Sequence, residues 1–170
     1  SERTANISVH ATYNAQPVSD VNITIAASYG SFSASALTNL SGICTFTFVA
    51  PPVNEEVNVT ITAYASKTGY AATSSSATIT LTPGILELEV NAPAEVLSGT
   101  NITISVGVTC NLTPVQNALV TVTSYVGNFS QLTNSDGICI FNIVIPETNE
   151  KTTISITIAA SKNGYRAVSY

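Results

Sequence analysis

The sequence predicts an all-β protein made of two consecutive β-sandwich modules, on two observations. Short segments throughout the chain alternate apolar and polar residues with the period of a half-buried strand, and no useful length has a helical period. In addition, the segment 37–51 recurs 95 residues later as 132–146, so the chain holds two copies of one β unit. We therefore predict a first module at residues 1–83 and a second module at residues 84–170.

The repeated segment reads as a tight turn followed by a strand. It runs Leu37-Thr-Asn-Leu-Ser-Gly-Ile-Cys-Thr-Phe in the first copy and Leu132-Thr-Asn-Ser-Asp-Gly-Ile-Cys-Ile-Phe in the second. A polar turn that ends in glycine is followed by alternating residues, and a proline stops the strand in each copy. The alternation predicts that the cysteine and the phenylalanine of each copy point into the core.

The other strands of the first module follow from the same alternation. They are expected at residues 4–13, 21–27, 32–37, 57–65 and 75–81, separated by turns rich in glycine, proline and asparagine. The second module opens with a strand at residues 85–90 and then repeats this order. The junction between the modules is short and stiffened by Pro83, which predicts an elongated rod of two sandwiches arranged end to end.

Alignment of the copies predicts that each module is one strand short. Nothing before Ser1 corresponds to residues 85–90, and Tyr170 corresponds to Ser75, where the last strand of the first module is still to come. An unfilled slot exposes a sheet edge and invites pairing. The chain is then either a segment of a longer array or a subunit that receives a strand from its neighbour in a head-to-tail polymer. Residues 1–5 are too short and too polar to be an obvious donor.

The composition predicts a folded protein from outside the cell. Charged residues make up only 9% of the chain and apolar residues 45%, a combination that excludes a disordered chain. The net charge of −5 argues against a nucleic-acid partner. No apolar run is long enough to insert into a membrane and no signal segment is present, while the initial Ser1 suggests a processed or excised chain.

Seven Asn-x-Ser/Thr sequons are candidate N-glycosylation sites. They are Asn6, Asn22, Asn39, Asn58, Asn101, Asn111 and Asn128. N-linked glycans there would supply the hydration that so few charges do not, which favours an extracellular, cell-surface glycoprotein. A chain this rich in asparagine, serine and threonine also produces sequons by chance, so the occupancy of each stays open.

The three cysteines leave two arrangements open. Cys110 and Cys139 both fall on inward registers of the second module, which permits a Cys110–Cys139 disulfide with Cys44 as a small buried side chain. Three buried free thiols fit the pattern equally well.

No group of residues predicts catalysis, a metal site or a cofactor. His10 is the only histidine and falls on the outward face of its strand, without a nearby cluster of metal ligands. The glutamates at 55–56 and at 147 and 150 lie in equivalent loops but lack the converging oxygen ligands of a dedicated calcium site. Lys67 and Lys162 lie at turns, where lysine is ordinarily solvated. We therefore predict that the protein is not an enzyme.

The chain resembles immunoglobulin-like repeats of the intimin/invasin type. The resemblance lies in Pro17-Val-Ser-Asp-Val-Asn-Ile-Thr-Ile, in Gly30-Ser-Phe-Ser, in the repeated turn and in Val59-Thr-Ile-Thr-Ala, with matching places in the second copy. The closing Ala-Ser-Lys-x-Gly-Tyr is similar to repeats of archaeal cell-surface and S-layer-associated proteins. The resemblance implies tandem Ig-like antiparallel β-sandwiches in stalks that project other parts from a cell, and it brings no catalytic residue with it.

Two functions follow as expectations. The first is a structural, non-catalytic module of a cell-surface filament, pilus-like thread, stalk or S-layer, with copies of itself or neighbouring modules as partners. The alternative is an adhesin-type module that binds a carbohydrate or a cell-surface receptor through loops at the sandwich tip. Carbohydrate sites favour exposed aromatic rings, and the candidates here are Tyr29, Tyr64, Tyr125 and Tyr170. The absence of tryptophan favours the structural function.

Overall fold

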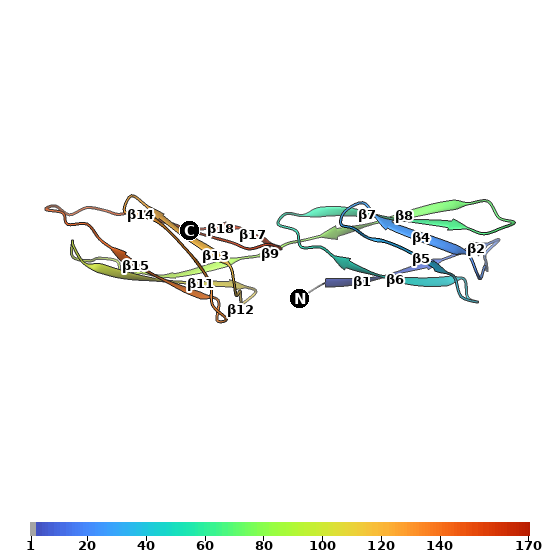
Figure 1. The fold of residues 1–170 in the computed structure, drawn as a ribbon, viewed down its shortest axis with the longest axis horizontal. Coiled ribbons are helices and arrows are strands. Elements are labelled where there is room, and N and C mark those ends of the chain that lie inside the picture. Colours follow the sequence, from blue (N-terminus) through green and yellow to red (C-terminus); the bar gives the residue numbers. More distant parts are fainter. Residues whose placement is uncertain (1–2) are drawn as a thin grey trace. The chain divides into compact units, whose positions relative to one another are not determined.

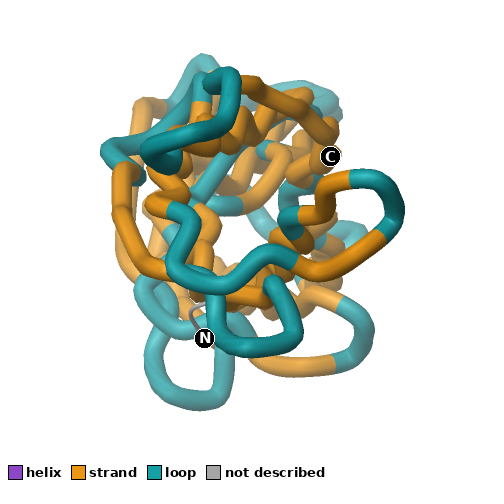
Figure 2. Tube along the Cα trace, turned by 90° about the vertical axis from the view of Figure 1, so that its right-hand side faces the viewer, coloured by secondary structure: helices purple, strands orange, loops and turns teal. Residues whose placement is uncertain are grey.

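The computed structural model describes residues 3–170, and every regular element in this range is a strand (Figure 2). The chain divides into two compact units, the first ending at Thr82 and the second beginning at Pro83. These units are called the first and the second module below. The prediction of an all-β sandwich fold is confirmed.

The first module has one two-stranded and one four-stranded main sheet (Figure 1). Strand β1 pairs with β6 in the smaller sheet, β2 and β3 form a hairpin, and the larger sheet has the order β5-β4-β7-β8. The strands are β1 (Arg3–His10), β2 (Thr12–Tyr13), β3 (Gln16–Pro17), β4 (Asn22–Ala27), β5 (Ser33–Leu37), β6 (Ile43–Ala50), β7 (Val57–Ser66) and β8 (Thr73–Leu81).

The second module repeats this plan with one strand more beside its counterpart of β1. Strand β11 pairs with β15 on one side and with β10 on the other, and the opposite sheet has the order β14-β13-β16-β18. Its strands are β9 (Gly84–Ile85), β10 (Glu87–Asn91), β11 (Asn101–Cys110), β12 (Thr113–Pro114), β13 (Leu119–Ser124), β14 (Gly127–Leu132), β15 (Ile138–Val144), β16 (Ile156–Ser161), β17 (Tyr165–Arg166) and β18 (Val168–Ser169). The two residues of β18 take the place where β8 begins in the first module.

Each module packs its two sheets around one apolar core. In the first module Ile23 and Ile25 of β4 face Phe46 and Phe48 of β6, all of them buried. In the second module the matching positions of β13 and β15 are buried in the same way. The cysteine and the phenylalanine of the repeated segment therefore point inward in both copies, as their alternation predicts.

Two strand predictions differ from the structure in detail. The strand expected at residues 4–13 ends at His10, because the chain turns into the β2–β3 hairpin at Asn14 and Ala15, both in the left-handed backbone region. The strand expected at residues 85–90 is split at Leu86, which is buried between β9 and β10. Strand β9 pairs in parallel with β17 in a separate two-stranded sheet, while β10 pairs with β11, so this segment passes from the β9–β17 pair to the sheet that contains β11.

The repeated turn is built by its asparagine. The Oδ1 atom of Asn39 accepts hydrogen bonds from the backbone N–H groups of Ser41 (2.9 Å) and Ile43 (3.0 Å). Asn134 does the same for Asp136 (3.0 Å) and Ile138 (2.9 Å) in the second copy. This is the turn geometry that short polar side chains favour, and it explains the shared Thr-Asn-x-x-Gly pattern.

Candidate strand-binding groove in the first module

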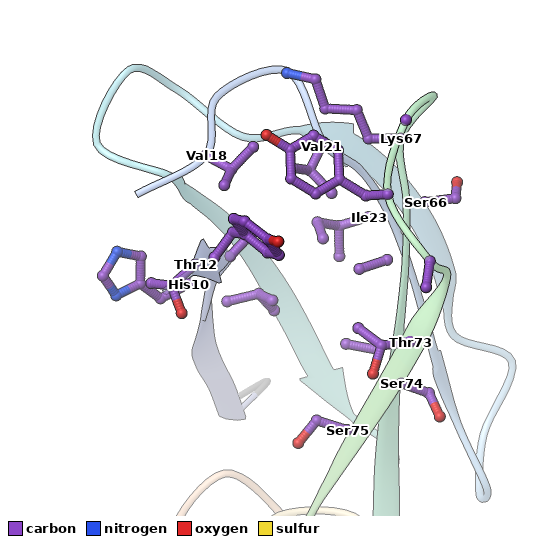
Figure 3. A pocket seen from close by; sticks show the side chains of 18 residues that line it. His10, Thr12, Val18, Val21, Ile23, Ser66, Lys67, Thr73, Ser74 and Ser75 are labelled. Carbon is purple, nitrogen blue, oxygen red and sulfur yellow. The ribbon is translucent and has the colours of Figure 1, made fainter. Parts of the chain in front are cut away.

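A groove of about 820 Å³ lies in the first module between β1 and the β7–β8 pair. One wall is made by residues of β1 and the hairpin that follows it, and the other by the end of β7 and the start of β8. Figure 3 shows Val21 and Ile23 of the core between these walls. The groove therefore opens on the apolar core, at the place where the two sheets of the sandwich meet.

The second module contains a strand at the equivalent place. There β10 pairs antiparallel with β11, with Val90 opposite Val106 and Leu88 opposite Val108. The counterparts of these two β11 residues, 97 positions earlier, are Val9 and Ala11, and both line the groove. On its side facing away from β6, β1 pairs with no strand among residues 3–170.

Core burial differs between the modules because of this one strand. Val106 and Val108 are 0% exposed, whereas Val9 and Ala11 are only half-buried. On the opposite wall, Ala160 is buried and its counterpart Ala65 is half-buried. The first module thus leaves open to solvent an apolar strip that the second module covers.

At the place in the second module that corresponds to the end of the groove, Gly84 is bound. In the second module the backbone N–H of Gly84 donates to the carbonyl of Gly164 (3.0 Å). A Cβ atom on Gly84 would lie 2.6 Å from the ring of Tyr165, so only glycine fits there. In the first module the counterpart of Tyr165 is Tyr70, whose exposed ring contacts Tyr13 edge to face, with 5.4 Å between the centroids.

The described residues that line the groove include the Lys67 ammonium group and no carboxylate, although the chain as a whole carries a net charge of −5. His10 lines the groove at its β1 edge, and its imidazole projects from the outward face of that strand, as its alternation predicts (Figure 3). The Lys67 ammonium donates to the carbonyl of Ser19 (2.5 Å), which ties the end of β7 to the loop before β4. Lys162 donates to Gln116 in the same way, so these lysines have structural partners that the sequence did not reveal.

The sequon asparagines all have exposed side chains. This holds for Asn6, Asn22, Asn39, Asn58, Asn101, Asn111 and Asn128. They are accessible as glycan acceptors, and their modification stays a prediction. Asn39 has a second role, because its Oδ1 atom also shapes the repeated turn.

Of the two cysteine arrangements that the sequence leaves open, the structure has the one with free thiols at Cys44, Cys110 and Cys139. Cys139 is paired with Val106, four residues before Cys110 on the same strand. At about 3.3 Å per residue this places the two cysteines roughly 13 Å apart, beyond the reach of a disulfide. Cys110 instead lies near Gly84, where a Cβ atom would be 3.3 Å from its sulfur.

We expect the three thiols to react at different rates. Burial raises the pKa of Cys44 and Cys139, so their reactive thiolate forms are suppressed at neutral pH. Cys110 is only half-buried and is expected to be alkylated first by iodoacetamide, with the other two modified only when the chain unfolds. Burial raises the pKa of both thiols above its value in the unfolded chain. Their contribution to the free energy of unfolding is therefore fully present below the unfolded pKa, and it is lost as pH rises through the folded pKa.

Mass spectrometry of native and urea-unfolded chain after a short alkylation measures this order. Equal modification of all three thiols in the native chain would contradict the burial of Cys44 and Cys139. A native chain lighter by two hydrogens under non-reducing conditions would contradict the free thiols.

The remaining predicted residues form no further site. No group of three or more histidine, cysteine, aspartate or glutamate side chains is placed to hold a metal ion within the described range. The exposed tyrosines at 29, 64, 125 and 170 lie on separate segments of the chain. No helix among the described residues is long and apolar enough to cross a membrane.

Sequence reasoning missed two buried hydroxyl groups that position the loops. Thr38 donates to the carbonyl of Val18 (2.8 Å) and accepts from the N–H of Val21 (3.0 Å). Thr133 makes the same pair of bonds in the second module. The available signal was the threonine that precedes asparagine in both copies of the repeated turn.

The comparisons with known proteins are limited. No protein-family model matches the chain, and no curated protein matches it. Among solved structures, the chain is similar to the chicken CNTN1 FN1-FN3 domains, with 11% identity and a TM-score of 0.31. The match covers 97% of this chain and 59% of that one, so the chain spans less than two thirds of its neighbour. A likeness this weak carries no argument about function.

Proposed function

We propose that this chain is a structural, non-catalytic extracellular module of a cell-surface filament, pilus-like thread, stalk or S-layer. In this proposal neighbouring modules or copies are joined by strand complementation, and N-linked glycans hydrate the surface. The observation that supports it is the open groove beside β1, where the second module has β10. An unpaired edge next to exposed apolar core favours pairing with another strand.

The low charge of the chain supports the glycan part of the proposal. Charged residues make up 9% of the sequence, and all the sequon asparagines are exposed. Glycans on them would keep so weakly charged a surface hydrated.

Electron microscopy of native cell-surface material tests the proposal. We expect regularly spaced, glycan-decorated filaments or arrays that contain this chain, with glycopeptides at the sequons in mass spectrometry. A chain recovered only as a dispersed, unassembled and unglycosylated protein would contradict the proposal.

The alternative function, carbohydrate binding, has one observation in its favour. Tyr13 and Tyr70 are exposed, contact each other and line the groove together with Lys67. We rank it second because Tyr70 stands where Tyr165 packs against Gly84 in the second module, which gives this ring a role in holding a strand. Glycan-array binding that is lost in a Tyr70→Ala variant would reverse this ranking.

A further inference from the structure

We infer that the groove of the first module binds an extended strand of defined pattern, Gly-Ile-Leu-Glu-Leu-Glu-Val, supplied by a neighbouring module of the same repeat type. This inference deepens the proposed function and rests on it, since it names the partner of the open edge. The second module provides the template, because its residues 84–90 have that sequence and occupy the equivalent place.

The correspondence between the groove and the template covers both walls. On β11 the template contacts the counterparts of residues 9–13 of the first module. At β17 it contacts the counterparts of residues 69–71. Both ranges line the groove.

The pairing in the second module predicts the register of the incoming strand. The residue equivalent to Val90 would lie opposite Val9, and the residue equivalent to Leu88 opposite Ala11. These two apolar side chains would cover the half-buried strip, as they do over the fully buried valines of β11. A shift by one residue would turn them out into water, so the alternation itself selects the register.

The outward face of the strand predicts acidic residues. In the second module Thr109 donates to the Glu87 carboxylate (3.3 Å), and the first module keeps a threonine at this place, Thr12. Glu89 lies opposite Gly107, whose counterpart is His10. The imidazole of His10 can donate to a carboxylate there, and the lining of the groove has no acidic residue to repel it.

Glycine is required where the strand enters. The template places Gly84 between Tyr165 and Cys110, and the counterparts in the first module are Tyr70 and Tyr13. These two rings now contact each other across the end of the groove. A side chain larger than hydrogen would have to displace two tyrosines, so the pattern Pro-Gly before the apolar residues is part of the recognition.

The test uses the complete chain and a fluorescently labelled peptide with the sequence of residues 83–91. We expect saturable one-to-one binding by fluorescence anisotropy. The control peptide has the same composition with its leucines and glutamates exchanged, and it should bind at least about tenfold more weakly because its apolar side chains face water. Equal binding of the two peptides would overturn the inference, since it would show an unspecific apolar surface.

Variants of the chain locate the site. Val9→Lys puts an ammonium group into the strip and should weaken peptide binding at least about tenfold. Thr45→Lys, on the exposed face of β6 in the same sheet, is the matched control and should leave binding unchanged. Unchanged binding to a folded Val9→Lys variant would overturn the inference.

A charge exchange tests the register without touching the core. His10→Glu should weaken binding about threefold by placing a carboxylate opposite the Glu89 position, and a peptide with lysine at that position should recover it. Because His10 is exposed, this variant is expected to fold. Weakening without recovery would overturn the predicted register.

Two further outcomes separate this inference from the alternatives. A dimer of the chain that forms without peptide and is lost in Val9→Lys, measured by sedimentation velocity, would assign the groove to a second copy and overturn the inference. Specific peptide binding combined with native material free of filaments would leave the strand site standing and contradict the proposed function. Filaments whose assembly is unaffected by Val9→Lys would support the proposed filament function and contradict the strand site.

Discussion

A Gly137→Ala variant is expected to destabilise the second module by about 3 kcal/mol or more. Gly137 has a φ of +72°, and a Cβ atom there would lie 2.5 Å from the carbonyl oxygen of Val108 and 3.0 Å from the nitrogen of Val115. Both contacts are with backbone, so no side-chain rotation relieves them. The turn would have to move away from β11, although the N–H of Val108 donates to the Gly137 carbonyl (2.8 Å).

Gly69→Ala is the matched control for this prediction. Gly69 also has a positive φ, +88°, but nothing lies within 4 Å of a Cβ atom placed on it. Its substitution should cost only about 1 kcal/mol, the backbone preference alone. Urea unfolding followed by circular dichroism compares the two variants, and equal losses of stability would show that the close approach at Gly137 is unimportant.

A Thr133→Val variant is expected to cost about 2–4 kcal/mol. Valine keeps the shape of the side chain but removes the hydroxyl that donates to Val115 (2.6 Å) and accepts from the N–H of Ala118 (2.9 Å). Thr133 is 2% exposed, so water cannot easily replace either bond. A buried donor and a buried acceptor are then left without partners.

Thr133→Ser separates the hydroxyl from the methyl group. Serine keeps the hydroxyl and should lose only about 1 kcal/mol, the loss expected for one buried methyl group. The same urea titration measures both variants. If valine proved as stable as wild type, the two hydrogen bonds would not stabilise this loop.

The sheets were largely predictable from the sequence because their alternation is regular. Ile23, Ile25, Phe46 and Phe48 follow the two-residue period and all lie in the core. The prediction of one continuous strand at residues 85–90 was wrong at Leu86, where β9 ends and β10 begins. The point at which a segment changes from one pairing partner to another depends on the strands that surround it. Local alternation carries no information on such partners.

The sequence predicted a missing strand in the first module but not the groove that forms the candidate site. Comparing the copies indicated that a strand like 85–90 has no counterpart in the first module, but not that a groove would lie there. The contact between Tyr13 and Tyr70 arises from a hairpin and a turn that are far apart in the sequence. The sequence could not decide between a Cys110–Cys139 disulfide and free thiols, because two inward positions on neighbouring strands need not lie opposite each other.

Backbone hydrogen exchange of the complete chain, with and without the peptide of residues 83–91, tests the central claim most directly. Without peptide, amides in residues 8–12 that face away from β6 should exchange at least about tenfold faster than their counterparts in 105–109, which pair with β10. With peptide, protection should appear along residues 8–12 and leave 105–109 unchanged. Amides of residues 8–12 that are as slow as those of 105–109 without peptide, or that gain no protection with it, would contradict the account.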